Sequence, residues 1–277
     1  MPAEHKMVEE TTQQVVSAGA NEPVKEKKRF SHRHLSILPN ACTSMNLFCG
    51  YLSIVMTSQG EFLLAGWLIL IANIFDILDG RLARLTSVTS RFGAELDSLA
   101  DLVSFGVAPA FLVYSRYLEH DKISGLIISG IFMLCGALRL ARFNITPPSR
   151  QDVFEGLPIP AGAGILATMT IFELQFFSFL KIPGFFIPIV VLTTAFLMVS
   201  KIEYPAMKKT PKTSGKRKIM VLMVLVALFV NPPMTLFFIS WGFALYGLTF
   251  SFLKNLMLLL RKFKKKQSVD PAGEQPS

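Results

Sequence analysis

The chain has 277 residues, of which 51% are hydrophobic and 17% are charged. Soluble domains carry about 25% charged residues, so this composition excludes an ordinary soluble protein and indicates one embedded in a membrane. The net charge of +9 arises in loops and tails, which suits contact with anionic membrane lipids, and the sequence contains no nucleic-acid-binding motif.

Hydrophobic segments predict an all-α fold, a polytopic bundle of about eight membrane helices with a six-helix core and two C-terminal helices. The first six are expected to cover approximately Leu38–Met56, Phe62–Ile77, Ala94–Tyr114, Ile123–Leu140, Ala161–Phe179 and Pro183–Ser200. The remaining stretch, Ile219–Leu260, is too long for one span, and Asn231-Pro232-Pro233 divides it because proline interrupts a helix interior. Residues 1–30 predict a disordered cytoplasmic tail, 31–260 the membrane domain, and 261–277 a basic and then polar tail.

The distribution of positive charge predicts the orientation in the membrane. With eight helices, only Arg116, Lys122 and Lys181 of the 28 lysines and arginines lie on one side. Positive residues accumulate in cytoplasmic loops, so we expect a multi-pass protein of the cell (inner) membrane with both termini in the cytoplasm. Charge alone also permits a six-helix topology.

Four carboxylates lie close together in the sequence between two apolar segments. A charged side chain in a membrane helix costs roughly 2.5–3.5 kcal/mol, so such groups face a polar cavity and usually a partner. Asp76 and Asp79 are three residues apart and Asp97 and Asp101 are four apart, so each pair lies on one face of its helix. Residues 80–92 are enough to end one helix and begin the next. We therefore expect the two pairs to face each other at the cytoplasmic end of the bundle.

The carboxylates point to a bound cation. Clustered carboxylates remain ionised when a cation lies between them. Oxygen ligands favour a hard ion such as Mg²⁺, Mn²⁺ or Ca²⁺, and protein-bound Mg²⁺ commonly binds substrate phosphates as well. Gly80 and Ala83 are small enough for a ligand to approach, and the guanidinium of Arg84 matches phosphate. A purely structural alternative is an acidic turn paired with nearby arginines, although ordinary turns do not place carboxylates at helical spacing on both flanks.

The spacing Asp-x2-Asp-Gly-x2-Ala-Arg-x8-Gly-x3-Asp-x3-Asp resembles the signature of the CDP-alcohol phosphotransferases. Its positions are filled by Asp76, Asp79, Gly80, Ala83, Arg84, Gly93, Asp97 and Asp101. The resemblance implies a membrane enzyme that breaks a CDP-linked pyrophosphate with the help of a divalent metal. Such an enzyme transfers the phosphoryl-bearing group to an alcohol and releases CMP.

Further stretches between about Leu38 and Lys208 are similar to the bacterial and archaeal phosphatidylserine synthases of this superfamily. They are LPNACTSMNLFCGYLSI, FGAELDSLADLVSFGVAPA, LRLARFN, EGLPIPAGAG and LMVSKIEYPAMK. This resemblance implies CDP-diacylglycerol and L-serine as substrates, phosphatidylserine and CMP as products, and a homodimer. The main alternative is the same chemistry with glycerol 3-phosphate or inositol phosphate as the acceptor.

Site roles follow from the signature and from spacing. The predicted ligands of Mg²⁺ or Mn²⁺ are Asp76, Asp79, Asp97 and Asp101, and the resemblance implies that Asp101 is also the general base. The residues expected to bind the CDP-lipid are Gly80, Ala83, Arg84, Gly93, Asn40, Thr43 and Asn46. The last three recur at three-residue spacing on the first helix. Capping alone explains Asn40 but not the other two, which favours a polar face lining the cavity.

Two arginines after the fourth helix are candidates for the acceptor site. Arg139 and Arg142 are three residues apart and share a helix face. They predict either two positive anchors at the cytoplasmic boundary or a site for a substrate carboxylate or phosphate.

Two other function classes fit less well. A membrane prenyltransferase also uses aspartate-bound Mg²⁺ and pyrophosphate, but its usual Asp-rich pattern differs from the one here. A cation transporter commonly has broken helices in matching halves, and the sequence shows no such pairing.

Overall fold

The computed structural model describes residues 37–86, 91–146, 154–176, 184–200, 202–204 and 215–267. The predictions for the N-terminal tail 1–30, for most of the basic loop 205–214 and for the last ten residues therefore lie outside the described part of the chain.

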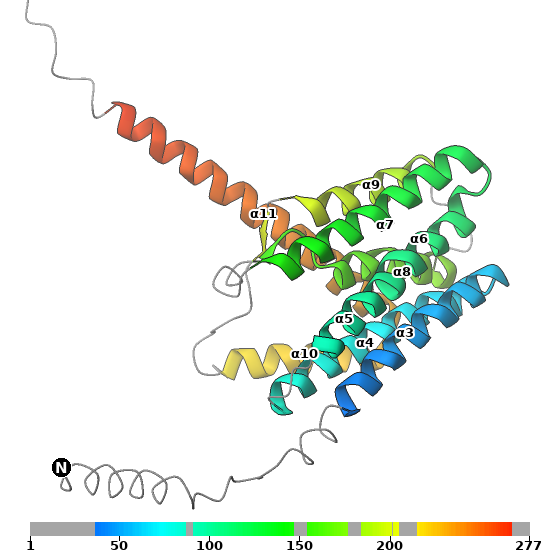
Figure 1. The fold of residues 1–277 in the computed structure, drawn as a ribbon. Helices are drawn as coiled ribbons and strands as arrows, with labels where there is room; N and C mark the ends of the chain where they lie inside the picture. The colour runs from blue at the N-terminus through cyan, green and yellow to red at the C-terminus, as the bar shows by residue number, and fades with distance from the viewer. Residues whose placement is uncertain are drawn as a thin grey trace, which may run out of the picture.

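Helices make up almost all of the described structure, which confirms the all-α prediction (Figure 1). The helices are α3 (Ile37–Ser58), α4 (Phe62–Thr86), α5 (Arg91–Asp101), η1 (Leu102–Val107), α6 (Ala108–Val113), η2 (Tyr114–Leu118), α7 (Lys122–Ile145), α8 (Ile159–Phe176), α9 (Phe186–Val199), α10 (Gly215–Val230) and α11 (Pro232–Gln267). The η elements are π-helical turns, and together with α5 and α6 they form one apolar span, Arg91–Leu118. Counted this way, the described residues contain the eight predicted helices.

Five of these helices are long and apolar enough to cross a membrane: Phe62–Leu85, Arg91–Leu118, Lys122–Ile145, Ile159–Phe176 and Pro232–Ser251. Helix α9 is apolar but shorter. Helix α3 is not among the five, because its first half carries the polar residues that the sequence placed on one face. The chain is therefore a polytopic helical membrane protein.

Helix α4 continues further than the sequence predicted. We expected it to end near Ile77, but it runs through Gly80 to Thr86. One glycine costs a helix roughly 1 kcal/mol, and the leucine, alanine and arginine residues that follow are good helix formers. At 25 residues the helix is about 37 Å long, which exceeds a hydrocarbon core of about 30 Å. A helix of this length is long enough to cross the apolar layer even when it is tilted.

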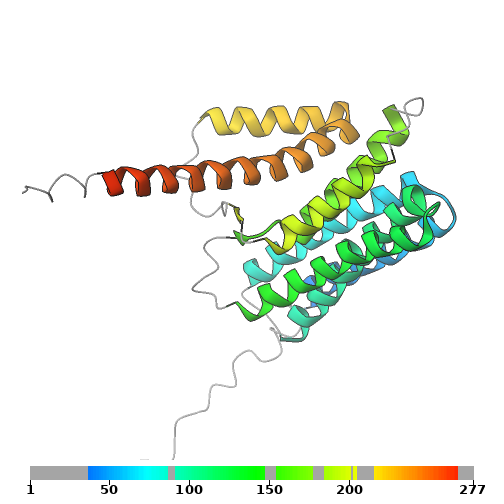
Figure 2. The same ribbon diagram turned by 90° about the horizontal axis from the view of Figure 1, so that it is seen from above.

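The C-terminal helices form a hairpin on one side of the bundle, and its α11 packs against α8 (Figure 2). The predicted break is confirmed, because Asn231 separates α10 from α11. Its side-chain oxygen accepts a hydrogen bond from the Met234 backbone N–H at 3.2 Å, which caps the new helix. Helix α10 begins at Gly215 instead of Ile219, and α11 continues past Leu260 to Gln267.

Helix α8 is the most buried of the five candidate membrane spans, and α4, α9 and α11 pack against it. Its small residues permit these close contacts, as its Ala-Gly-Ala-Gly start suggests. A Cβ added at Gly162 would lie 3.1 Å from Met198 Sδ on α9, and one at Gly164 would lie 3.3 Å from Ser240 Oγ on α11.

A short antiparallel pair of strands joins the segment before α8 to the segment after α9. Strand β1 (Phe154–Glu155) pairs with β2 (Glu203–Tyr204). Gly156 then turns with φ +79°, and an added Cβ would lie only 2.4 Å from the Met198 carbonyl oxygen. Glycine is required at this turn by both its conformation and its space.

Candidate active site

Helices α4 and α5 bring three of the four predicted aspartates together. One carboxylate oxygen from each of Asp76, Asp97 and Asp101 lies within 4.8 Å of the others. Asp79 lies outside this set, one turn further along α4, and its Oδ2 accepts a hydrogen bond from Thr43 at 2.9 Å. Asp76 of the first pair thus meets both aspartates of the second pair, and α4 and α5 each pack against α3.

These carboxylates fit a divalent cation. Oxygens that share an ion at about 2.1–2.6 Å lie at most roughly 4–5 Å apart, which matches the observed separation. Asp97 Oδ1 is buried, and none of the residues that the structure describes donates a hydrogen bond to it. A buried carboxylate oxygen without a donor is costly, and a cation would compensate for it. The cluster therefore offers the oxygen ligands that Mg²⁺ or Mn²⁺ binds. Such an ion would supply the positive charge that the cluster lacks.

The polar face of α3 contacts the carboxylates directly. Thr43 donates to Asp79, and Asn46 Nδ2 donates to Asp101 Oδ1 at 3.2 Å. Both side chains are buried, whereas Asn40, one turn earlier, is half-buried. Capping does not account for these bonds, because they cross to two other helices. Thr43 and Asn46 thus orient two of the four carboxylates.

The small residues of the signature leave room beside the carboxylates. A Cβ added at Gly80 would meet only the Arg84 guanidinium, at 3.8 Å. The exposed Arg84 side chain folds back along α4, where its Nε donates to the Gly80 carbonyl oxygen at 2.8 Å. Ala83 and Gly93 are half-buried on α4 and α5. A phosphate approaching Gly80 would therefore meet the Arg84 guanidinium.

The two arginines of α7 have different surroundings. Arg139 is 9% exposed, lies within electrostatic range of Asp101, and its Nε has no hydrogen-bond partner among the described residues. Arg142 Nη1 donates to the Val199 carbonyl oxygen at 3.2 Å, at the end of α9. Only Arg139 therefore carries a buried donor that is still available beside the carboxylates.

Sequence reasoning missed two contacts that hold this end of the bundle together. Asn144 Nδ2 on α7 donates to Ser98 Oγ on α5 at 2.9 Å, next to Asp97. Ser104 Oγ in η1 donates to the Asn46 carbonyl oxygen at 2.9 Å. Serine is common at contacts between membrane helices, and no spacing rule singles out these two contacts. The one available signal was that Ser104 follows Asp101 by three residues.

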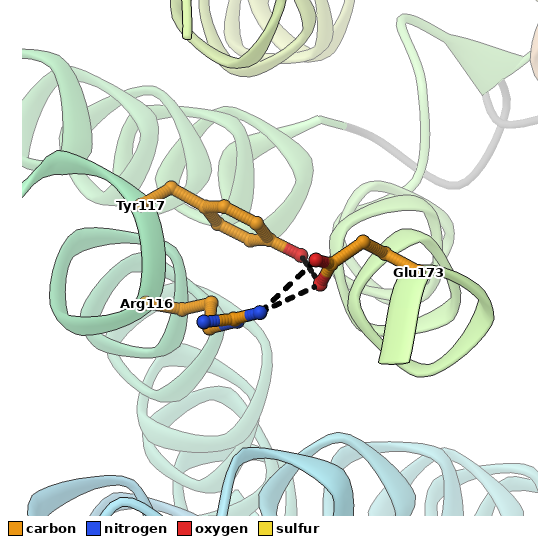
Figure 3. A network of polar contacts seen from close by, with 3 residues as sticks. All are labelled: Arg116, Tyr117 and Glu173. Carbon is orange, nitrogen blue, oxygen red and sulfur yellow. Dashed lines mark hydrogen bonds and ion pairs between the residues drawn. The ribbon is translucent and has the colours of Figure 1, made fainter. Parts of the chain in front are cut away.

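A second polar cluster lies far from the carboxylates (Figure 3). Arg116 Nη2 forms an ion pair with Glu173 at 3.0 Å, and the Tyr117 hydroxyl donates to the same carboxylate at 3.1 Å. The Arg116 guanidinium also lies 5.6 Å from the centre of the Phe62 ring. Arg116 follows Asp101 by 15 residues along one helical span, which places it roughly 22 Å away. This cluster joins η2, α8 and the start of α4, and it has no part in the carboxylate site.

The chain matches known proteins over the segments that build the site. Residues 36–196, more than half of the chain, match the CDP-alcohol phosphatidyltransferase family. A CDP-diacylglycerol–serine O-phosphatidyltransferase of Helicobacter pylori is 40% identical over 217 residues, which cover 77% of this chain and 90% of that protein.

Two archaeal proteins are similar over a shorter part of the chain. A protein of the same name from Methanocaldococcus jannaschii is 40% identical over 178 residues, 64% of this chain and 77% of that protein. The archaetidylserine synthase of Methanothermobacter thermautotrophicus is 41% identical over 170 residues, 61% of this chain and 69% of that protein. The chain belongs to the CDP-alcohol phosphatidyltransferase family, as the signature predicted, and is an enzyme of that family.

Proposed function

We propose that the protein transfers the phosphatidyl group of CDP-diacylglycerol to the hydroxyl of L-serine and releases CMP. The observation that carries the proposal is the group of three carboxylates within 4.8 Å, formed by the signature residues Asp76, Asp97 and Asp101. The choice of serine is supported by relatives named serine O-phosphatidyltransferases, whose similarity extends beyond the signature.

The metal site in this proposal consists of Asp76, Asp79, Asp97 and Asp101. A bound Mg²⁺ or Mn²⁺ would neutralise charge on the pyrophosphate and on the departing CMP. Asp76 and Asp97 contribute carboxylate oxygens from facing helices. Asp79 is held by Thr43 one turn away, where it completes the acidic lining next to the nucleotide.

Asp101 acts as the general base. The serine hydroxyl oxygen attacks the phosphorus that carries diacylglycerol, the bond from that phosphorus to the CMP oxygen breaks, and Asp101 takes the hydroxyl proton. A carboxylate is a weak base for a hydroxyl, so it acts mainly as the proton becomes acidic in the transition state. The Asn46 amide holds one Asp101 oxygen, Oδ1, which orients the carboxylate during the transfer.

The CDP-lipid binds along α3 and the end of α4 in this proposal. Arg84 lies beside the open space at Gly80 and would contact a phosphate. Ala83 and Gly93 allow close approach, while Asn40, Thr43 and Asn46 line the nucleotide side. We place this end of the bundle at the cytoplasmic face, since the lysine and arginine bias favours it. Water-soluble serine and CMP then reach the site without crossing the membrane.

The acceptor test uses the purified full-length protein with CDP-diacylglycerol. L-Serine, glycerol 3-phosphate, inositol phosphate or no alcohol is added in turn, and CMP is quantified by chromatography. We expect CMP release only with serine, complete loss with a chelator, and recovery when Mg²⁺ or Mn²⁺ is restored. Equal CMP release with another alcohol would overturn the choice of serine, and release that survives the chelator would overturn the metal site.

A further inference from the structure

Ser104 has no place in the chemistry above, yet it lies fully buried beside it. Its side chain is 0% exposed, and its hydroxyl donates to the Asn46 carbonyl oxygen at 2.9 Å. The bond joins residues 58 positions apart, from η1 to α3. The side-chain amide of the same Asn46 donates to Asp101. Asn46 therefore accepts a hydrogen bond from Ser104 with its backbone and donates one to Asp101 with its side chain.

The surroundings of Ser104 are shaped for this contact. A Cβ added at Gly50, one turn after Asn46, would lie 2.3 Å from Ser104 Oγ and 2.7 Å from Ser104 Cα. No other residue type fits there without moving α3 away. The π-helical turn Leu102–Val107 begins directly after Asp101 and contains Ser104. Such turns change the angular relation between successive side chains and are frequent at functional sites.

The orientation of the Asn46 amide depends on this backbone contact. Asn46 is 0% exposed, and none of the described residues donates to its Oδ1. The amide is therefore fixed by two things, its bond to Asp101 and the position of its own backbone. Ser104 contributes to the second of these, because its hydrogen bond joins the Asn46 backbone to the turn that directly follows Asp101.

We propose that Ser104 is a positioning residue that orients the Asp101 carboxylate through Asn46. Its hydroxyl sets the height and rotation of α3 against the π-helical turn, and Gly50 provides the space for the contact. The effect is on the orientation of the base and not on the binding of serine. This inference rests on the proposed function, in which Asp101 receives the serine proton.

The test compares two serines that make equivalent bonds. Ser104→Ala removes the η1–α3 bond. Ser53→Ala removes a 2.9 Å bond to the Ala65 carbonyl oxygen, which joins α3 to α4 and comes from a serine that is also 0% exposed. We expect Ser104→Ala to lower kcat roughly fivefold to tenfold, as for loss of one buried hydrogen bond, with the KM for L-serine within about twofold of wild type. Ser53→Ala should keep kcat within about twofold of wild type at a similar loss of thermal stability.

A double-mutant cycle tests whether Ser104 acts through Asn46. Asn46→Ala removes the donor to Asp101 and is expected to lower kcat by itself. In the Asn46→Ala background, Ser104→Ala should then change kcat by less than about twofold, because the side-chain bond through which Ser104 acts on Asp101 is already missing. Multiplicative losses, or equal kcat losses in Ser104→Ala and Ser53→Ala, would overturn the positioning role. Failure of the proposed function is distinguishable, since wild type would then lack serine-dependent CMP release.

Discussion

Arg139 and Arg142 lie one helical turn apart on α7, and their surroundings in the structure differ. Arg142 is bonded to the end of α9, while buried Arg139 keeps an unused donor near Asp101. The sequence alone treats the two residues alike, because both have the same charge and share one helix face. Burial and hydrogen-bond partners depend on segments far away in the chain, which spacing does not reveal.

This difference gives a prediction at the residue scale. Arg139→Ala should raise the KM for L-serine by roughly 10-fold or more, because a charge-assisted bond to the serine carboxylate is lost, and should leave the KM for CDP-diacylglycerol within about twofold. Arg142→Ala is the matched control and should change the KM for serine much less. Steady-state kinetics with each substrate varied in turn provides the measurement. Equal losses for both substrates in Arg139→Ala would refute the assignment.

At the scale of elements, the contact between α3 and η1 depends on Gly50. Gly50→Ala should lower the free energy of unfolding by about 1–3 kcal/mol, because the new methyl overlaps Ser104 and forces the helices apart. Gly130→Ala on α7 is the control, since an added Cβ there meets nothing within 4 Å and alanine favours a helix. Thermal unfolding in one detergent compares them. A Gly50→Ala protein as stable as wild type would show that α3 and η1 adjust freely.

The sequence predicted the elements well and their ends less well. Apolar length gave the number of helices, and Asn231-Pro232-Pro233 gave the α10–α11 break. Gly80 was expected to lie beyond the end of α4, but the helix continues because one glycine is only a small penalty. The hydrophobic pattern of the sequence does not indicate the π-helical turns. Helix α7 packs against both turns, and α3 and α8 pack against the first, which are tertiary contacts that a local pattern does not report.

At the scale of the whole molecule, the carboxylate cluster and the Arg116–Glu173 ion pair lie at different ends of the bundle. The four aspartates were recognisable from local spacing, and so was the polar face of α3. The partners at the opposite end were not, because Arg116 and Glu173 are 57 residues apart. One signal was present and unused: Glu173 is a carboxylate inside an apolar helix, and such a residue normally has a partner.

Because the two clusters are far apart, we predict that a substitution in the Arg116–Glu173 cluster changes stability without changing the activity at the carboxylates. Glu173→Gln should lower the free energy of unfolding by about 1–3 kcal/mol, since it leaves Arg116 without its counter-charge. The kcat at saturating serine should stay within about twofold of wild type below the unfolding transition. Unfolding and activity are measured on the same preparation. A large loss of kcat in a folded Glu173→Gln protein would mean that the two ends are coupled.

The central claim is transfer of the phosphatidyl group to the serine hydroxyl at the carboxylate cluster. Serine labelled with ¹⁸O in its hydroxyl tests it most directly, with both products analysed by mass spectrometry. We predict that the label appears in phosphatidylserine and not in CMP, and that Asp97→Asn slows its appearance by at least about 100-fold. Label in a cytidine-containing product, or release of CMP with phosphatidate and no labelled lipid, would contradict the account.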